Sequence, residues 1–310
     1  MAINVQNKVV GHIASLLAVI FFSFNIPATT YIFHGWLDAS AYTFIRTSGG
    51  FLICWLISFG IKNQKVAWKQ DWLTILSGGV LGLAIFFFLY GYGIGQTSPV
   101  DAAIILTLSP IIVLILSVFI FKEKITTLKT VGILLALGGA LLIILLQGHR
   151  GKEAAMLGNI LVFVAAFIYS VYLIFTRDVS RKYNPVNLLR WMFLFAFLVS
   201  LPVGLPDLLH SALVREHQTT PVLVALYIAI FPSALAYVLI PVALKSLSST
   251  IVSMYIYLIP ILATAASVFL GQAVLRWDEP VAIVLVLLGV YLANKNTRKS
   301  TPGGNALQKG

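Results

Sequence analysis

The stretch Ser98–Phe121 reads SPVDAAIILTLSPIIVLILSVFIF, and its pattern returns after a shift of 150 residues. The later copy, Ser248–Gly271, reads SSTIVSMYIYLIPILATAASVFLG. The identities occur without a gap at Ser98/Ser248, Leu108/Leu258, Pro110/Pro260, Ile111/Ile261 and the Ser-Val-Phe of 117–119/267–269. The chain therefore contains an internal repeat, and each copy carries a proline in the middle of an apolar segment.

The composition is that of a membrane protein. Of the 310 residues, 59% are hydrophobic and only 10% are charged, whereas soluble domains carry about a quarter charged residues. The net charge of +11 comes from short basic clusters between apolar runs, a distribution that favours membrane orientation over nucleic-acid binding. The single cysteine, Cys54, excludes an intramolecular disulfide and a cysteine-based metal site.

Ten segments have the roughly 20 mostly apolar residues that a membrane helix needs. They are 9–33, 40–61, 72–95, 99–121, 127–147, 155–176, 186–205, 222–245, 250–271 and 279–295. The first is too long for a signal-peptide core and lacks a cleavage pattern, so we expect it to be a retained span. The connections leave no room for a soluble domain, and the polar tail from Asn296 onward is expected to be disordered.

The basic residues between the spans predict the orientation. If the N-terminus is cytoplasmic, the inner side holds fifteen Lys and Arg residues and the outer side holds four, at Arg150, Lys152, Arg215 and Arg276. Positive residues are retained on the cytoplasmic side. We therefore expect both termini in the cytoplasm.

The repeat extends well beyond the opening pair. Leu76–Ile94 aligns with Leu226–Leu244 at the same shift, and Gly139 aligns with Gly289. Each copy holds five predicted spans, and because five is odd, the second copy enters the membrane from the opposite side. The expected fold is an all-α polytopic membrane protein with ten transmembrane helices as two inverted five-helix repeats, 1–150 and 151–295, followed by a cytoplasmic tail, 296–310. Such repeats are typical of secondary transporters, whose substrate site lies near the membrane midplane.

Several motifs occur in order along the chain. They are the 97–110 segment TSPVDAAIILTLSP, the Phe121-Lys-Glu-Lys-Ile-Thr run, Gly132 with Gly138-Gly139, and Arg46 and Arg190 early in the second helix of each half. Over about Val9 to Asn294, this pattern resembles the EamA-type ten-helix members of the drug/metabolite transporter superfamily. One departure is Gly271-Gln272, where that family typically has Gly-Glu, although Glu123 is kept in the first half. The resemblance implies a carrier of small metabolites, amino acids or drugs in a bacterial inner membrane, often an exporter.

Acidic residues and histidines are missing from the middle of every predicted span. Because an intramembrane carboxylate is the usual proton-relay element, this pattern favours a facilitator or an exchanger over a proton antiporter with a midplane acid. The sequence also lacks HExxH, a paired Asp and a Ser/His/Asp set, which argues against an intramembrane protease or metalloenzyme. We therefore expect neither an enzyme nor a cofactor or metal site.

Polar and aromatic residues deep within the spans are the candidate substrate-binding residues. Asn25 in a lipid-facing helix would leave its hydrogen-bonding positions unpaired, and several tyrosines lie too far from the span ends to be interfacial anchors. The candidates are Asn25, Tyr90, Thr107, Tyr169, Tyr172, Tyr237, Ser253 and Tyr257. Close helix packing is the alternative explanation for the small and hydroxyl residues around Pro110 and Pro260. It explains Tyr257 poorly, because its hydroxyl would need a partner.

Three charged residues are candidate anchors with a structural alternative. Arg46 and Arg190 each lie about six residues inside a span. They either extend to the lipid headgroups, or they hold an anionic substrate group or an ion pair, for example Arg46 with Asp38 or Asp101. Asp101 follows the helix-starting pair Ser98-Pro99, so it also suits the positive end of a helix dipole.

The predicted function is alternating-access transport of a small solute bound between the spans of the two halves. A lining of rings and neutral hydrogen-bonding groups suits amino acids and related amphipathic metabolites better than strongly cationic drugs. The alternatives left open are a proton-coupled multidrug efflux carrier, a non-transporting scaffold or enzyme, and a channel. The expected partners are a small-molecule substrate and the lipid bilayer, without nucleic acid. A monomer is one of the oligomeric states left open.

Overall fold

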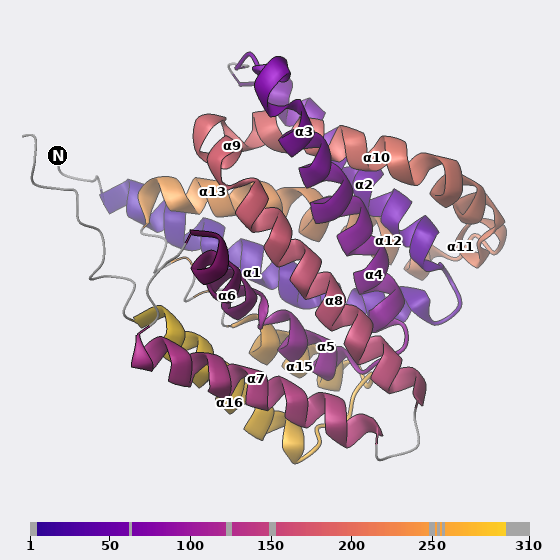
Figure 1. Ribbon diagram of the computed structural model, residues 1–310. Coiled ribbons are helices and arrows are strands. Elements are labelled where there is room, and N and C mark those ends of the chain that lie inside the picture. The colour runs from indigo at the N-terminus through magenta and orange to yellow at the C-terminus, as the bar shows by residue number, and fades with distance from the viewer. Residues whose placement is uncertain are drawn as a thin grey trace, which may run out of the picture.

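The structure is a computed structural model that describes residues 5–61, 64–121, 126–148, 153–247, 252, 255 and 258–295. Within these ranges every regular element is helical, and Figure 1 shows the helices gathered into one bundle. Residues 1–150 contain α1 (Val5–Phe33), α2 (Ala39–Phe59), α3 (Trp68–Gly79), η1 (Val80–Ile85), α4 (Phe86–Ile94), α5 (Pro99–Leu106), α6 (Ser109–Phe121) and α7 (Thr127–Gly148). Residues 151–295 contain α8 (Glu153–Phe175), α9 (Arg177–Lys182), α10 (Pro185–His210), α11 (Ala212–Arg215), α12 (Thr219–Ile230), η2 (Phe231–Leu235), α13 (Ala236–Ser246), α15 (Ile259–Phe269) and α16 (Asp278–Lys295).

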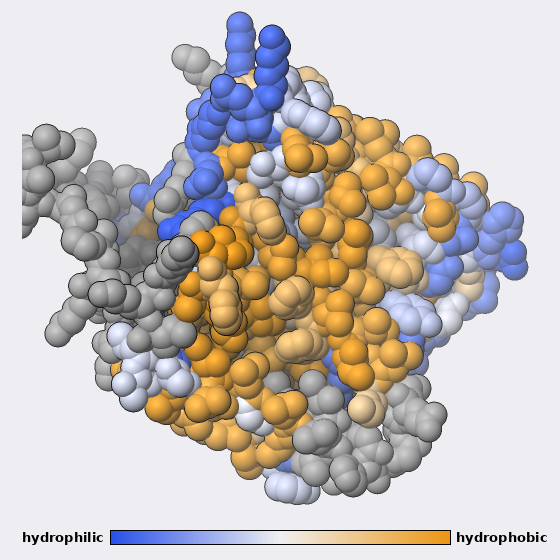
Figure 2. Space-filling model, viewed as in Figure 1, coloured by the Kyte–Doolittle hydropathy of each residue, from blue (hydrophilic) through white to orange (hydrophobic). Residues whose placement is uncertain are grey.

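Six helical stretches in the described ranges are long and apolar enough to cross a membrane. They are Lys8–Phe33, Trp68–Ile94, Pro99–Ile120, Ala155–Phe175, Pro185–His210 and Thr219–Ser246. Thr127–Gly139 and Ile259–Phe269 are shorter apolar helices. Large apolar side chains cover the outside, and Figure 2 shows them across the centre of one face, with hydrophilic residues near the start of α3 and near α11. The protein is therefore a multi-pass helical membrane protein, while the total of ten spans stays a prediction.

Polar residues at the helix starts account for several helix boundaries. The Asp38 side chain accepts from the Ala41 N–H at the start of α2, and Asn184 accepts from the Val186 N–H at the start of α10. Ser98 accepts from the Asp101 N–H, with Pro99 as the first residue of α5. Each such cap satisfies a backbone donor that has no partner inside its own helix.

Helices α7 and α16 pack against each other through two equivalent contacts. A methyl group added at Gly139 would lie 2.9 Å from the Val286 side chain and 3.1 Å from the Ala282 carbonyl oxygen. One added at Gly289 would lie 2.5 Å from both the Ala136 nitrogen and the Gly132 oxygen. A shift of 150 residues converts one contact into the other. Later residues of α7 face earlier residues of α16, and the reverse, so these repeat-related helices run antiparallel. This is the arrangement that inverted repeats require.

The two repeats also share a backbone irregularity. The π-helical turn η1 ends at Ile85 and η2 ends at Leu235, positions that differ by 150. Short π-helical segments are rare, and they widen a helix locally, often at functional sites. The turns η1 and η2 therefore occupy corresponding positions in the Trp68–Ile94 and Thr219–Ser246 stretches.

The proline in the opening sequence interrupts its helix. Helix α5 ends at Leu106 and α6 begins at Ser109. Because Pro110 has no N–H, the carbonyl of Leu106 lacks its usual helical partner, and it accepts a hydrogen bond of 2.8 Å from the Ser109 hydroxyl instead. The serine beside the proline thus supplies the partner that the interrupted helix lacks.

Gly289→Ala should destabilise the protein because the added methyl group meets the backbone of α7. Overpacking of this kind costs about 1–3 kcal/mol. Gly138→Ala is the matched control, because a methyl group there meets nothing within 4 Å and alanine is the better helix former by roughly 1 kcal/mol. Thermal unfolding can be followed with a thiol-reactive dye, since Cys54 is buried. Equal melting temperatures for the two variants would contradict the close packing of α16 against α7 at Gly289.

Candidate functional site

A polar cluster lies inside the bundle around Arg46 of α2. The arginine is only 2% exposed. Its Nε donates to the Ser233 hydroxyl at 2.8 Å, and its Nη1 donates to the Tyr42 hydroxyl at 2.9 Å. Ser233 belongs to η2, so the guanidinium joins the first repeat to the π-helical turn of the second.

The cluster continues into α1 and α4 through neutral groups. The Tyr42 hydroxyl lies 3.1 Å from the Thr29 hydroxyl, which donates to the Asn25 oxygen at 3.5 Å. The Asn25 amide nitrogen donates to the Tyr90 hydroxyl at 3.0 Å. Asn25 and Tyr90, both predicted substrate-binding residues, therefore lie in one hydrogen-bonded network with Arg46.

Helical spacing explains why these side chains meet. Tyr42 and Arg46 are four residues apart on α2, and Asn25 and Thr29 are four apart on α1, so each pair shares a face. Ser233 follows Pro232 in η2, and its hydroxyl also donates to the Ile228 carbonyl five residues earlier. The wider π-helical turn thus places this hydroxyl between its own backbone and Arg46.

Aromatic rings surround the network. The Arg46 guanidinium carbon lies 3.8 Å from the centre of the Phe87 ring, which is a cation–π contact. From Tyr42 a row of neighbouring rings leads through Tyr90, Phe86, Tyr169 and Tyr172, with successive ring centres 6.5, 5.8, 5.0 and 5.6 Å apart. The row joins α2 and α4 to α8 and contains three of the predicted tyrosines.

The remaining central tyrosine, Tyr237 of α13, faces the same region. Its ring packs edge-on against Phe22, Phe87 and Phe193, which come from α1, α4 and α10. Tyr237 keeps some accessible surface, and Phe87 contacts both its ring and the Arg46 guanidinium. Tyr237 therefore lies beside the Arg46 cluster.

The described part of the structure places none of the other three predicted substrate-binding residues in this cluster. Thr107 is buried at the end of α5, and its hydroxyl donates to the Ala103 carbonyl oxygen of its own helix at 2.9 Å. Ser253 and Tyr257 lie outside the described residues. Their predicted role in substrate binding therefore stays a prediction.

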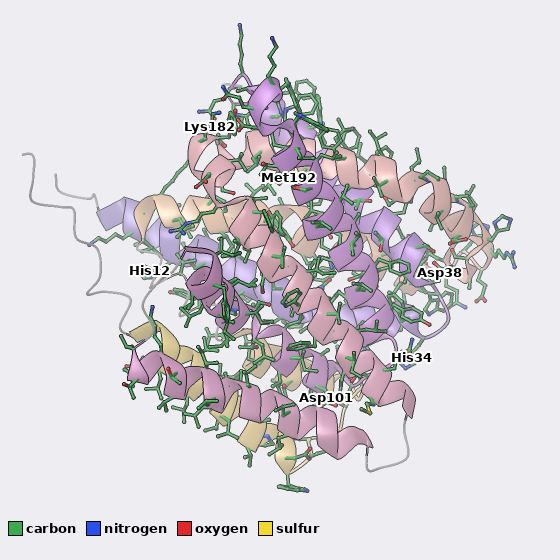
Figure 3. All side chains as sticks on the ribbon, in the orientation of Figure 1. His12, His34, Asp38, Asp101, Lys182 and Met192 are labelled. Atoms are coloured by element: carbon green, nitrogen blue, oxygen red, sulfur yellow. The ribbon has the colours of Figure 1, made fainter. Side chains whose placement is uncertain are left out.

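The three predicted charge anchors do not meet one another. Asp101 lies in the first turn of α5, fully buried, with its carboxylate 3.4 Å from Arg276. Arg190 lies beside Trp55 and Trp191, with its guanidinium carbon 5.4 Å from the centre of each ring. The suggested pairing of Arg46 with Asp38 or Asp101 is absent from the described structure, because Asp38 caps α2 and Asp101 faces Arg276. Figure 3 shows Asp38 and Asp101 at well-separated places in the structure.

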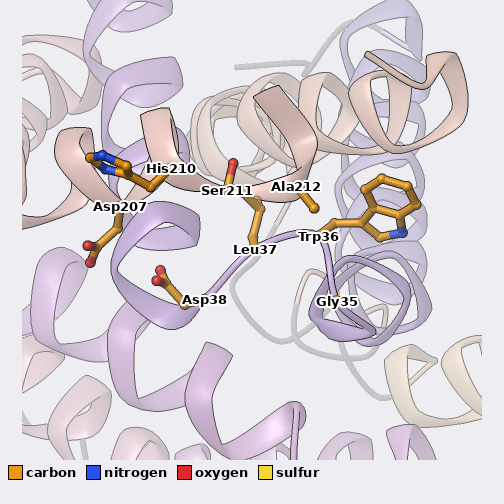
Figure 4. A pocket seen from close by; sticks show the side chains of 8 residues that line it. All are labelled: Gly35, Trp36, Leu37, Asp38, Asp207, His210, Ser211 and Ala212. Carbon is orange, nitrogen blue, oxygen red and sulfur yellow. The ribbon is translucent and has the colours of Figure 1, made fainter. Parts of the chain in front are cut away.

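A separate pocket of about 320 Å³ opens at the border of the bundle. It lies between the α1–α2 connection and the end of α10, and Figure 4 shows the side chains of Asp38, Asp207 and His210 around it. The Ser40 hydroxyl lies within hydrogen-bond distance of both carboxylates, to either of which it can donate its one hydrogen. Asp38 and His210 are exposed to solvent, so this pocket is a surface feature and not part of the Arg46 cluster.

The residues of the cluster that were not among the sequence-based candidates include Tyr42, Ser233 and Phe87. Tyr42 could have been found from its spacing of four residues to Arg46. Ser233 could not, because its contact depends on the π-helical turn, for which the sequence gives no clear signal. Phe87 stands in the run Phe86–Phe88, and nothing in the sequence distinguishes the ring that faces Arg46.

Sequence comparison finds one family. The model of the EamA-like transporter family matches residues 9–145 and 156–295, one match in each repeat.

The individual relatives are distant but nearly full-length. An uncharacterized transporter, YyaM, of Bacillus subtilis is 23% identical over 278 residues, which cover 88% of each chain. An uncharacterized transporter of Clostridium kluyveri is 25% identical over 305 residues, or 94% of each chain. A probable terminal-alkyne amino-acid exporter of Streptantibioticus cattleyicolor is 25% identical over 254 residues, covering 79% of this chain and 81% of that one. One solved crystal structure covers 94% of this chain and 98% of its own, with a TM-score of 0.62 and 19% identity, a likeness of fold alone.

Tyr90→Phe should lower stability more than Tyr92→Phe on the same helix. Tyr90 is 2% exposed and accepts the only hydrogen bond that the Asn25 amide nitrogen makes to a described residue. A buried donor left unsatisfied costs about 1–3 kcal/mol. Tyr92 is 46% exposed and serves as the control. The dye-based melting temperatures of the two variants measure the difference, and equal values would show that the Asn25–Tyr90 contact contributes nothing to stability.

Proposed function

The chain belongs to the EamA-like transporter family, and from this premise we propose that it is a secondary transporter that moves small metabolites across a bacterial inner membrane. Amino acids and related amphipathic solutes are the favoured class. The observation that carries the proposal is the polar and aromatic cluster around Arg46, inside a bundle whose outer surface is apolar. Polar groups inside a membrane protein are costly and usually mark a solute pathway.

The lining of this cluster fits an amphipathic solute. The row of rings from Tyr42 to Tyr172 presents apolar faces with hydroxyl groups at their edges. Asn25 and Thr29 add neutral hydrogen-bonding groups. Rings and neutral groups bind an apolar side chain and a polar backbone together, which is the chemistry of an amino acid.

Alternating access follows from two similar halves that pack in two nearly equivalent ways. The antiparallel packing of α7 and α16 and the corresponding π-helical turns η1 and η2 support the inverted ten-span arrangement. We extend the proposal to two five-helix repeats, 1–150 and 151–295, with both termini in the cytoplasm. The direction we propose is export. The relative from Streptantibioticus cattleyicolor, whose name is that of a probable amino-acid exporter, supports it.

The competing classes have less support. In the described part of the chain, no group of three or more His, Cys, Asp or Glu side chains could hold a metal ion, and the polar cluster contains no acid–base pair suited to catalysis. A channel usually forms its pore from symmetric subunits or filter rings, whereas this chain carries two related halves of its own. A proton-coupled drug carrier is the alternative among transporters.

Solute counterflow in proteoliposomes tests the proposal. Liposomes that contain the purified protein and a high internal concentration of an unlabelled amino acid should transiently accumulate the labelled form, because a carrier exchanges solutes and a pore does not. Asn25→Ala and Tyr257→Ala should each lower the exchange rate roughly ten-fold, the effect of losing one hydrogen bond of about 1.4 kcal/mol.

Tyr92→Ala, on the exposed face of α4, is the control and should keep the wild-type rate. Absence of counterflow for every amino acid, or unchanged exchange in both site variants, would reject the proposed transport function or its site.

A further inference from the structure

Arg46 is a buried cation that has no acidic partner among the described residues. The ion pairs that the structure describes are made by Lys182 or Arg276. The hydrogen-bond partners of Arg46, the Ser233 and Tyr42 hydroxyls, are both neutral. A guanidinium carries five N–H donors, and two of them make hydrogen bonds to described residues, so Nη2 has no acceptor among those residues.

The charge cannot be removed by deprotonation. Arginine stays protonated in proteins, and an uncompensated buried charge is strongly unfavourable. The cation–π contact with Phe87 offsets only part of that cost. The guanidinium is nevertheless held firmly, because the Ser233 and Tyr42 hydroxyls and the Phe87 ring contact three of its sides. Such an arrangement is prepared for an anion from outside the protein.

We propose that Arg46 is the anion-binding residue of the transport site and that the transported solutes carry a carboxylate group. This inference rests on the proposed transport function and assigns its substrate class. Nη2 and the second hydrogen of Nη1 donate to the two carboxylate oxygens, in the paired geometry that guanidinium and carboxylate groups favour. The solute then supplies the counter-charge that the described residues around Arg46 do not provide.

One positive charge matches one carboxylate. The Arg46 guanidinium carbon lies 5.5 Å from the centre of the Tyr42 ring and 5.9 Å from that of the Tyr90 ring. A phosphate monoester carries nearly two negative charges near neutral pH, and a single guanidinium would leave part of that charge uncompensated. The site is therefore suited to a monocarboxylate.

The ammonium group of an amino acid has no comparable partner. The described groups of the network, from Asn25 and Thr29 to Tyr42 and Tyr90, are neutral amides and hydroxyls. A carboxylate-bearing solute with a neutral amide in place of its ammonium group, such as an N-acetyl amino acid, fits the same site. An amino-acid amide, which keeps the ammonium group and lacks the carboxylate, does not.

Ligand-induced thermal stabilisation of the purified full-length protein tests the inference. The probes are the common amino acids, their N-acetyl derivatives and their amides, at equal ionic strength, with the Cys54 dye as the readout. At least one amino acid and its N-acetyl derivative should raise the melting temperature, and the matching amide should not. Arg46→Gln should weaken the carboxylate affinity roughly 10- to 100-fold. Arg46→Lys should have a carboxylate affinity between those of the wild type and Arg46→Gln. An ammonium group keeps the charge but cannot form the paired geometry.

A second readout separates substrate binding from a structural role. Because the charge is uncompensated without ligand, Arg46→Gln should melt at or above the wild-type temperature when no ligand is present. Arg215→Gln removes the same charge from the exposed end of α11 and should leave carboxylate affinity unchanged. A large loss of melting temperature in ligand-free Arg46→Gln would mean that Arg46 is structural, and would overturn the inference.

The remaining outcomes are also decisive. The inference is wrong if no carboxylate in the panel stabilises the protein more than its amide, or if carboxylate affinity survives in Arg46→Gln. Counterflow of an amino acid together with equal binding of its amide would leave the transport function standing and reject the role of Arg46. Carboxylate-specific binding without any counterflow would support the role of Arg46 and reject the transport function.

Discussion

A guanidinium group held out of water is the constraint on which the centre of this structure depends. Arg46 cannot lose its proton, and its environment provides hydroxyls and a ring in place of a carboxylate. The Tyr42 and Ser233 hydroxyls contact the guanidinium, and Tyr42 in turn contacts Thr29 and so the Asn25–Tyr90 pair. Side chains from four elements, α1, α2, α4 and η2, therefore meet around this one charge. The binding site that we propose is completed only by its solute, because these contacts leave the charge without an acidic partner among the described residues.

The irregular parts of the backbone lie where a transporter would use them. The π-helical turns η1 and η2 stand at corresponding places of the two repeats, and η2 contributes Ser233 to the cluster. The break between α5 and α6 comes where Pro110 removes a backbone donor. Regular helices transmit motion as rigid rods, whereas a widened or broken turn lets two segments move separately. Helices α7 and α16, by contrast, pack closely through Gly139 and Gly289 and form a rigid contact between the halves.

Much of the architecture could be predicted from the sequence, since membrane helices are recognised by length and hydropathy. The repeat indicates that the segments containing η1 and η2 correspond to each other. It gives no signal that either segment would form a π-helical turn. Asn25, Tyr90, Tyr169, Tyr172 and Tyr237 could be selected because a polar group deep in an apolar span needs a partner. The hydrogen-bond partners of such residues could not be predicted from the sequence. The contacts Arg46–Ser233 and Asn25–Tyr90 join residues that are 187 and 65 positions apart. For the same reason the sequence suggested carboxylate partners for Arg46 that the fold places elsewhere.

The central claim is that a carboxylate solute completes the Arg46 cluster within the transport pathway. An experimental structure of the protein with a bound N-acetyl amino acid or amino acid would test it most directly. The account predicts the solute's carboxylate within about 3 Å of the Arg46 Nη atoms, with its apolar part against the ring row from Tyr42 to Tyr172. A solute bound elsewhere, or an Arg46 side chain paired with a carboxylate of the protein itself, would contradict it.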